Sequence, residues 1–210
     1  LYDGFMHPQP IHGLALPSAT LTLVLSLGAL TPSLSAKEPT EEQLQRIAAA
    51  LPTEAPASPE SDRRVLIFSR TNGFRHSSIE TGAATLIQLG QATGAYVAEH
   101  TEDESVFERD RLFSYDAVIM LNTTGEIFRP RNWSKNPDQL AEEKAREARL
   151  KENLVAFVQS GRGLAGMHSA TDTYKNWDAY NAMMGGAFAG HPWHMLVRLK
   201  NHQPDHPLRP

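Results

Sequence analysis

Short apolar runs recur along the chain from residue 64 onward. Val65–Phe68 and Ala117–Leu121 are wholly apolar, and Leu164–Met167 is a third run of the same kind. Runs of this length are typical of strands that are buried on both faces of a parallel sheet. Tyr96–Ala98 predicts a weaker strand between the first two, and Met195–Leu199 predicts a fifth strand.

Between these runs, apolar residues recur at helical spacing. One helix is predicted after Ser77–Ser78, either of which can cap it, and its apolar face extends from Ile79 to Gly90. A polar insertion at about 126–138 leads into a highly charged helix at about 139–159. Strands that alternate with helices in this way predict an α/β fold with a doubly wound parallel sheet.

The N-terminal part of the chain has a different pattern. Leu14–Leu34 is apolar, uncharged and rich in small residues, which is typical of a secretory signal with a cleavage site near Ala36. Two alternatives stay open. One is an uncleaved membrane anchor, which Pro17 and Pro32 make a poor candidate, and the other is a chain that starts at Met6.

The chain therefore divides into three expected parts. Residues 1–36 are the leader, which predicts an exported protein, periplasmic or secreted. Residues 37–62 are a polar linker with one short helix at about 41–50. Residues 63–210 form the α/β domain. Because Asp205–Leu208 has the composition of a loop in mid-course, we expect this domain to continue beyond the printed sequence.

Composition narrows the classes of partner. The formal net charge is -4 and there is no clustered basic patch, which argues against nucleic-acid binding. The chain has no cysteine, so disulfides, thiolate metal sites and cysteine nucleophiles are excluded. The loop after Val65–Phe68 lacks G-x-G-x-x-G, and no P-loop pattern occurs, which argues against dinucleotide and P-loop binding.

Turns rich in Gly, Thr, Asn and His adjoin the predicted strands. His76 closes the loop after the first strand, Asn122–Thr124 follow the third, His168–Asp172 follow the fourth, and His191 precedes the fifth. Ligands of open parallel sheets bind beyond the carboxyl ends of the strands. The sequence therefore predicts one pocket in which several imidazoles meet.

The exit from the fourth predicted strand is the most informative of these turns. Gly166–Ala170 has the outline of a strand-to-helix elbow, G-x-Nuc-x-G, with His168 at its centre. Histidine suits general acid–base catalysis because its pKa lies near neutrality. The alternative is that His168 only holds the turn by hydrogen bonding.

Four segments, in this order, resemble motifs of the ThuA-like (trehalose-utilisation) family. They are Phe68–Ile79, Leu121–Glu126, Gly163–Thr173 and Met184–Pro192. The resemblance implies a flavodoxin-like three-layer sandwich of the class I glutamine amidotransferase-like superfamily. It also implies a role in the metabolism of disaccharides or keto-sugar derivatives.

Two departures from the family pattern matter. The insertion at 129–136 is longer than usual. The amidotransferase cysteine has no counterpart, because His168 occupies the elbow, so glutamine amide hydrolysis is not expected.

Candidate catalytic residues are the three histidines of the predicted pocket. His168 is expected to move a proton, with His76 or His191 as its partner. No cofactor is required by this scheme. The same histidines leave open a divalent metal site, with Asp172 or Glu126 as an oxygen ligand.

Candidate substrate-binding residues come from the same turns. Asn122, Thr123 and Thr124 suit sugar hydroxyls, or they satisfy backbone groups in a turn. Arg75 can help to bind an anionic group of a ligand at the N-terminus of the following helix. Ser169 completes the set beside the elbow.

Three further side chains have two interpretations each. Asp172 orients His168 or caps the next helix. Trp177 and Trp193 stack on a sugar face or fill the margin of the core.

The first functional hypothesis is an exported enzyme for a lyase, isomerase or hydrolase step on a sugar-like small molecule. A non-catalytic carbohydrate-binding domain is the second, because a fold does not fix a function. A metal-dependent hydrolase is the third.

Overall fold

The computed structural model describes residues 38–191, 195–198, 200 and 202. The predicted leader and the alternatives to it lie outside these residues, as does Trp193, and they stay predictions. Among the described residues, no helix is long and apolar enough to cross a membrane.

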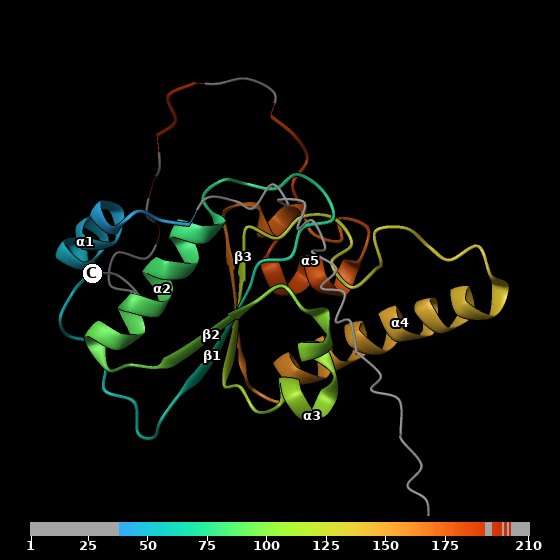
Figure 1. The fold of residues 1–210 in the computed structure, drawn as a ribbon, viewed down its shortest axis with the longest axis horizontal. Helices are drawn as coiled ribbons and strands as arrows, with labels where there is room; N and C mark the ends of the chain where they lie inside the picture. Colours follow the sequence, from blue (N-terminus) through green and yellow to red (C-terminus); the bar gives the residue numbers. More distant parts are fainter. Residues whose placement is uncertain (1–37, 192–194, 199, 201, 203–210) are drawn as a thin grey trace, which may run out of the picture. The chain divides into compact units, whose positions relative to one another are not determined.

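Four strands form one sheet in which every neighbouring pair is parallel (Figure 1). Their order is β2-β1-β3-β4. The strands are β1 Arg64–Phe68, β2 Val97–Thr101, β3 Ala117–Leu121 and β4 Gly163–Met167. This arrangement confirms the α/β, flavodoxin-like fold that the sequence and the resemblance predicted.

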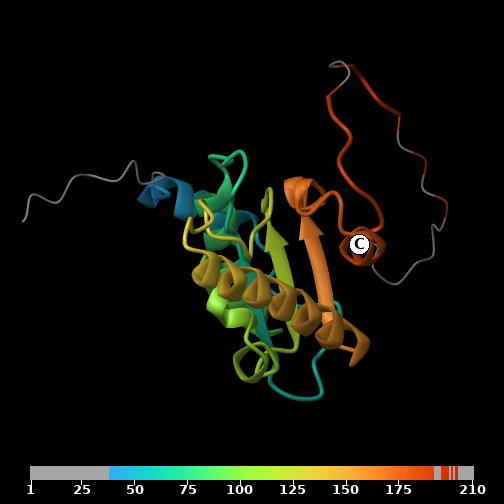
Figure 2. The ribbon, with the colours of Figure 1, turned by 90° about the vertical axis from the view of Figure 1, so that its right-hand side faces the viewer.

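The strands end level with one another at their carboxyl ends. Phe68, the last residue of β1, lies opposite Thr101 of β2 and Met120 of β3. Leu121 of β3 lies opposite Met167, the last residue of β4. In Figure 2 the arrowheads of β3 and β4 point to one edge, so the loops that follow the strands start side by side.

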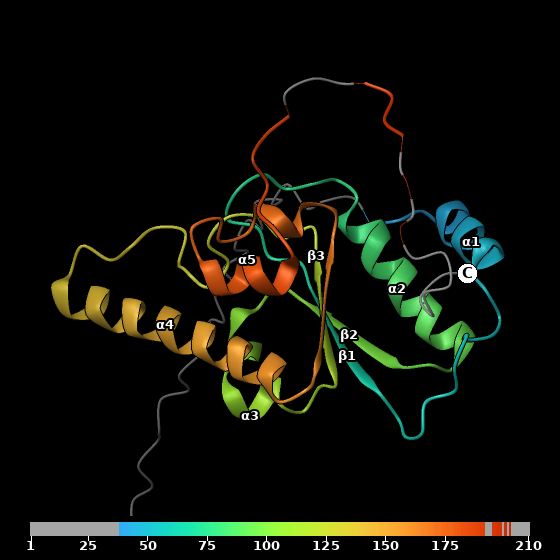
Figure 3. The same cartoon turned by 180° about the vertical axis from the view of Figure 1, so that it is seen from behind.

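Helices cover the sheet on two faces (Figures 1 and 3). On one face lie α1 and α2, and on the other lie α3, α4 and α5. The α-helices are α1 Glu41–Ala50, α2 Ile79–Thr93, α3 Arg109–Leu112, α4 Pro137–Gln159 and α5 Asp178–Met184. Two short 3-10 helices, η1 Glu104–Phe107 and η2 His168–Asp172, follow β2 and β4.

Local sequence signals set the ends of the longer helices. The Asn136 side chain accepts hydrogen bonds from the first turn of α4, and proline follows it at the first helical position. Helix α2 ends at Gly94, whose left-handed conformation (φ 66°) lets its N–H donate to Gly90. Ser78 is the N-cap residue of α2, one of the two serines predicted there, but its side chain makes no capping hydrogen bond. Its hydroxyl instead accepts a hydrogen bond from Asn122.

The larger of two apolar clusters lies on the face that α3, α4 and α5 cover. Its buried members include Phe68 of β1, Phe107 of η1 and Leu154 of α4. The smaller cluster joins Ile67 and Leu121 of the sheet to α2. Both faces of β1 are thus buried, as the continuous apolar run predicted.

The insertion before α4 was expected to be polar throughout, but two of its residues are packed in the apolar core. Ile127 and Phe128 belong to the larger apolar cluster and are almost fully buried. Next to them, Arg129 Nε contacts both carboxylate oxygens of buried Glu147, at 2.9 and 2.8 Å. The insertion is therefore fixed to α4 at its first residues, because two apolar side chains and an ion pair hold it there.

The predicted fifth strand is not formed in the described part of its range. Residues 195–198 have no regular secondary structure, and Met195, Leu196 and Val197 are exposed. A strand needs a ladder of hydrogen bonds with a neighbour, and an apolar pattern does not by itself supply one.

Replacing Glu147 tests how firmly the insertion is held. We expect Glu147→Ala to lower the free energy of unfolding by about 1–3 kcal/mol, because Arg129 loses its partner at a buried site. Glu108→Ala is the matched control, since Glu108 pairs with Arg149 at the surface, where such pairs contribute about 1 kcal/mol or less. Denaturant unfolding measures both, and equal losses in the two variants would contradict the buried anchor.

Candidate functional site

Three loops follow β1, β3 and β4, and we call them the rim loops: residues 69–78, 122–126 and 168–173. Isolated parallel bridges join them in pairs, Thr71 with Thr124 and Gly125 with Thr173. The N–H of Asn72 donates to the carbonyl of Thr124 at 2.8 Å, and the N–H of Gly125 donates to the carbonyl of Asp172 at 3.0 Å. The parallel pairing of the sheet thus continues past the strand ends.

His168 stands at the point where β4 turns into η2. Its φ of 51° lies in the left-handed region, which is uncommon for a residue with a side chain. Gly166, two residues earlier, packs so closely on α5 that a Cβ there would lie 2.7 Å from the sulfur of Met184. The structure therefore has the sharp elbow that the sequence outlined, with an exposed histidine at its centre. Conformations of this kind recur at functional sites, where the surrounding fold supports the strain.

His76 of the first rim loop meets His168 of the third. His168 Nε2 lies 3.4 Å from His76 Nδ1. The ring centroids are 4.4 Å apart, and the rings are inclined at 75°. One ring donates and the other accepts in such a contact, so the two imidazoles form a pair between which a proton can pass.

A cavity of about 510 Å³ opens around this pair. All three predicted histidines line it, since His191 joins His76 and His168 in its wall. The described residues of its lining are Phe74, His76, His168, Ser169, Thr171, Asp172, Phe188 and His191. The cavity lies beyond the carboxyl ends of the strands, where open α/β sheets bind their ligands.

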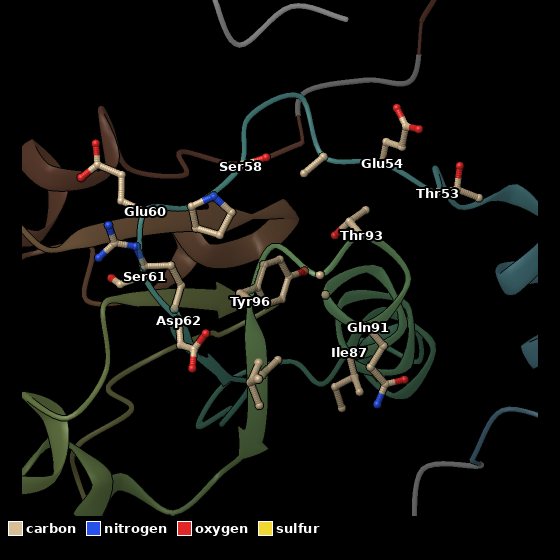
Figure 4. Close-up of a pocket in the computed structure, with 17 residues that line it drawn as sticks. Thr53, Glu54, Ser58, Glu60, Ser61, Asp62, Ile87, Gln91, Thr93 and Tyr96 are labelled. Carbon is tan, nitrogen blue, oxygen red and sulfur yellow. The ribbon is translucent and has the colours of Figure 1, made fainter.

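A larger cavity of about 830 Å³ lies at the opposite end of β1 and β2 (Figure 4). Its walls are the linker from Thr53 to Arg63, the end of α2 and the start of β2. Its lining includes acidic and hydroxyl residues such as Glu54, Glu60 and Tyr96, and no histidine is among the described residues that line it (Figure 4). Because it lacks acid–base groups that titrate near neutrality, the histidine cavity is the better candidate for catalysis.

A family model described as trehalose utilisation (ThuA) matches residues 64–209. The chain belongs to this family. Comparisons with curated proteins and with solved structures gave no match. The matched range contains all four strands and the whole histidine cavity, so the ThuA family assignment applies to the part of the chain that carries the site.

Three of the predicted binding residues of this ThuA domain point into the protein. Asn122, Thr123 and Thr124 are buried. Asn122 Nδ2 donates to Ser78 Oγ at 2.8 Å, and Thr124 Oγ1 donates to the carbonyl of Phe74 at 2.8 Å. Thr123 Oγ1 accepts from Thr173 Oγ1 at 2.8 Å. They hold the rim loops together, and only Thr124 does so by satisfying a backbone group, which is the structural alternative that the sequence left open.

Arg75 and Asp172 have ionic partners. Arg75 contacts Glu80 at 2.6 Å and Glu102 at 2.7 Å, and it is not part of the cavity lining. Asp172 lines the cavity and pairs with Lys175 at 2.9 Å. The guanidinium therefore fixes the first rim loop rather than facing a ligand, whereas the carboxylate of Asp172 remains within reach of one.

Ser169 has a hydroxyl without a partner. Its Oγ is shielded from solvent and makes no hydrogen bond in the described structure, although the residue lines the cavity. A buried hydroxyl in this state carries a cost of about 1–3 kcal/mol. A ligand with a polar group near Ser169 removes that cost, which supports the predicted binding role.

Burial lowers the pKa of His76, and the neighbouring imidazoles of His168 and His191 lower it further, while the carboxylate of Asp172 opposes them. The neutral form of His76 is therefore favoured at neutral pH, and a neutral imidazole can accept a proton.

No group of three His, Asp or Glu side chains within the described ranges is arranged to hold a metal ion. The proposed metal set of His76, His168 and His191 is thus not formed as a cage, even though all three residues line the cavity. The His76–His168 pair supplies two nitrogen donors.

Phe74, Thr171 and Phe188 line the cavity but were not among the predicted site residues. Phe74 and Phe188 lie two and three positions before His76 and His191, so an aromatic residue close to a loop histidine was the available signal. Trp177 instead packs against Tyr174 and Tyr180 at the margin of the core.

Titration of His76 tests the electrostatics of the pair. By NMR we expect an imidazole pKa below the ordinary value of 6.5, and a partial return toward it in His168→Asn, because one repelling neighbour is removed. Since folding lowers this pKa, the stability that His76 contributes is lost as pH falls below about 6.5. A His76 pKa that stays the same in His168→Asn would show that the two rings do not interact.

Gly125→Ala tests the contact between the rim loops. Gly125 has φ 72°, and a Cβ there would lie 2.9 Å from the backbone nitrogen of Gly73. The matched control is Gly94→Ala, which has φ 66° and open space around its Cβ. Both variants carry conformational strain, so we expect Gly125→Ala to lose about 1–3 kcal/mol more from overpacking. Denaturant unfolding measures the free energy of unfolding of both variants, and an equal loss in the two would contradict close packing of the loops.

Proposed function

We propose that this ThuA-family domain is an enzyme that processes a sugar or keto-sugar derivative through acid–base catalysis by His76 and His168. The observation that carries the proposal is the 3.4 Å contact between His168 Nε2 and His76 Nδ1 inside a cavity at the strand ends. The family description, trehalose utilisation, supports a sugar as the substrate class.

The two rings have different roles in proton transfer. Lyase, isomerase and hydrolase steps on sugars all need one group that takes a proton and one that returns a proton. Neutral His76 accepts the N–H of His168 Nε2 through its own Nδ1. His168 then has an unprotonated Nδ1, which takes the proton from a hydroxyl or from the carbon next to a carbonyl. The positive charge that forms on His168 is stabilised by the contact with His76, and His168 Nδ1 then returns the proton to the product or the leaving group.

Other groups of the cavity hold the substrate. Ser169 Oγ has an unused hydrogen-bonding capacity, and it follows His168 directly in the elbow. Asp172 can accept hydrogen bonds from sugar hydroxyls, since carboxylates are strong acceptors. His191 lines the same cavity and is the third candidate for a proton-transfer role.

His168→Asn is the sharpest test of this proposal. Asparagine tolerates the left-handed conformation of residue 168, so the elbow is kept while the acid–base group is lost. We expect kcat to fall by about 10²–10⁴-fold, with an unchanged circular dichroism spectrum and melting temperature. His202→Ala, a change of an exposed histidine outside the cavity, is the control and should retain activity.

The assay screens disaccharides, including trehalose, and their keto derivatives against the full chain, with products separated by chromatography. Turnover by His168→Asn at the wild-type rate on every sugar that the wild type converts would falsify the catalytic role. Sugar binding by the wild type in calorimetry, without any product, would favour a non-catalytic carbohydrate-binding domain instead.

A further inference from the structure

Two phenylalanine rings stand in the wall of the histidine cavity. Phe74 belongs to the first rim loop, and Phe188 belongs to the segment after α5. Phe74 is 70% exposed. A single exposed apolar residue is common on protein surfaces, but Phe74 shares the wall of this cavity with a second aromatic ring, and small-molecule sites are lined mainly by such side chains.

Contacts with the histidines fix the position of both rings. The Phe74 ring packs edge-on against His76, with centroids 4.8 Å apart, and the Phe188 ring lies 4.7 Å from that of His191. Their backbones are also held. The N–H of Phe188 donates to Thr171 at 2.8 Å, and the carbonyl of Phe74 accepts from Thr124 at 2.8 Å. The rings are thus placed in advance of any ligand.

Besides the three histidines, the polar residues of the described lining are Ser169, Thr171 and Asp172. Ser169 offers a free hydroxyl and Asp172 offers a carboxylate. No arginine or lysine is among the described residues of the lining, and nearby Arg75 is neutralised by Glu80 and Glu102. Lys175 contacts the lining residues Asp172 and Phe188, but its ammonium group is paired with the Asp172 carboxylate at 2.9 Å. A phosphate group would therefore meet only basic groups that already have carboxylate partners.

We infer that the substrate is an uncharged sugar in its closed pyranose form, with an apolar ring face stacked on Phe74 and Phe188. A pyranose has C–H groups on its faces and hydroxyls around its edge, so it matches a wall with flat apolar rings and a few hydrogen-bonding groups. An open-chain polyol has the same hydroxyls but no ring face. The inference rests on the proposed function, because it assigns a substrate class to the same cavity.

Isothermal titration calorimetry of the full chain tests the inference with four probes: trehalose, glucose, glucitol and glucose 6-phosphate. We expect trehalose and glucose to bind, and glucitol and glucose 6-phosphate to bind at least about ten-fold more weakly, which corresponds to about 1.4 kcal/mol.

Two variants isolate the aromatic rings. Phe74→Leu and Phe188→Leu keep an apolar side chain but lose the flat face, so we expect each to weaken glucose binding several-fold, up to about ten-fold. Glucitol affinity should not change. Val97→Ala is the matched control, because Val97 is 72% exposed at the start of β2, away from the cavity, and it should leave all affinities unchanged.

The outcomes separate this inference from the proposed function. Equal affinity for glucose and glucitol, tighter binding of glucose 6-phosphate than of glucose, or unchanged glucose binding in both leucine variants would overturn the inference alone. The loss of turnover expected in His168→Asn would then still stand. If the wild type binds none of the sugars and converts none, both fail.

Discussion

The candidate site depends on parallel pairing that continues beyond the sheet. The bridges between Thr71 and Thr124 and between Gly125 and Thr173 extend the order of β1, β3 and β4 into the rim loops. Without them, three loops from distant parts of the sequence would each have many conformations to choose from, and fixing them costs conformational entropy. Backbone hydrogen bonds between the rim loops offset this loss of entropy, and the side chains on the loops then have defined positions.

Residues of the rim loops separate into those that hold the loops and those that face the cavity. Asn122 and the two threonines after it are buried and bonded to neighbouring loops. His76 and His168 are the outward groups, and the left-handed conformation of His168 places its ring beyond the edge of β4. In many functional sites, a strained and exposed reacting residue is held in place by well-packed, hydrogen-bonded residues beneath it.

Much of this fold was predictable from the sequence, because wholly apolar runs such as Val65–Phe68 specify buried parallel strands and parallel strands bring their following loops together. The run of β4 was predicted to be buried in the same way, but most of its residues are exposed, Met167 among them, because β4 is an edge strand of the described sheet. The direction of individual side chains was not predictable. Asn122 points inward because its own φ is 52°, which no residue pattern reveals. Phe188 reaches the cavity through the path of the chain after α5. Ile127 and Phe128 are buried although the insertion that contains them is mostly polar, and 195–198 has no strand neighbour among the described residues.

Solvent-accessible ion pairs hold both of the rim loops that carry the paired imidazoles, since Lys175 contacts Asp172 of the third loop at 2.9 Å. Arg75 connects the first loop to Glu102, beyond the end of β2, and both side chains are more than one-third exposed. Dissolved ions screen such a contact at physiological strength, whereas the packing of Gly166 on α5 is insensitive to them. The spacing between the two imidazoles is therefore linked to the salinity of the medium, since both of the loops that carry them are held in part by solvent-accessible charge.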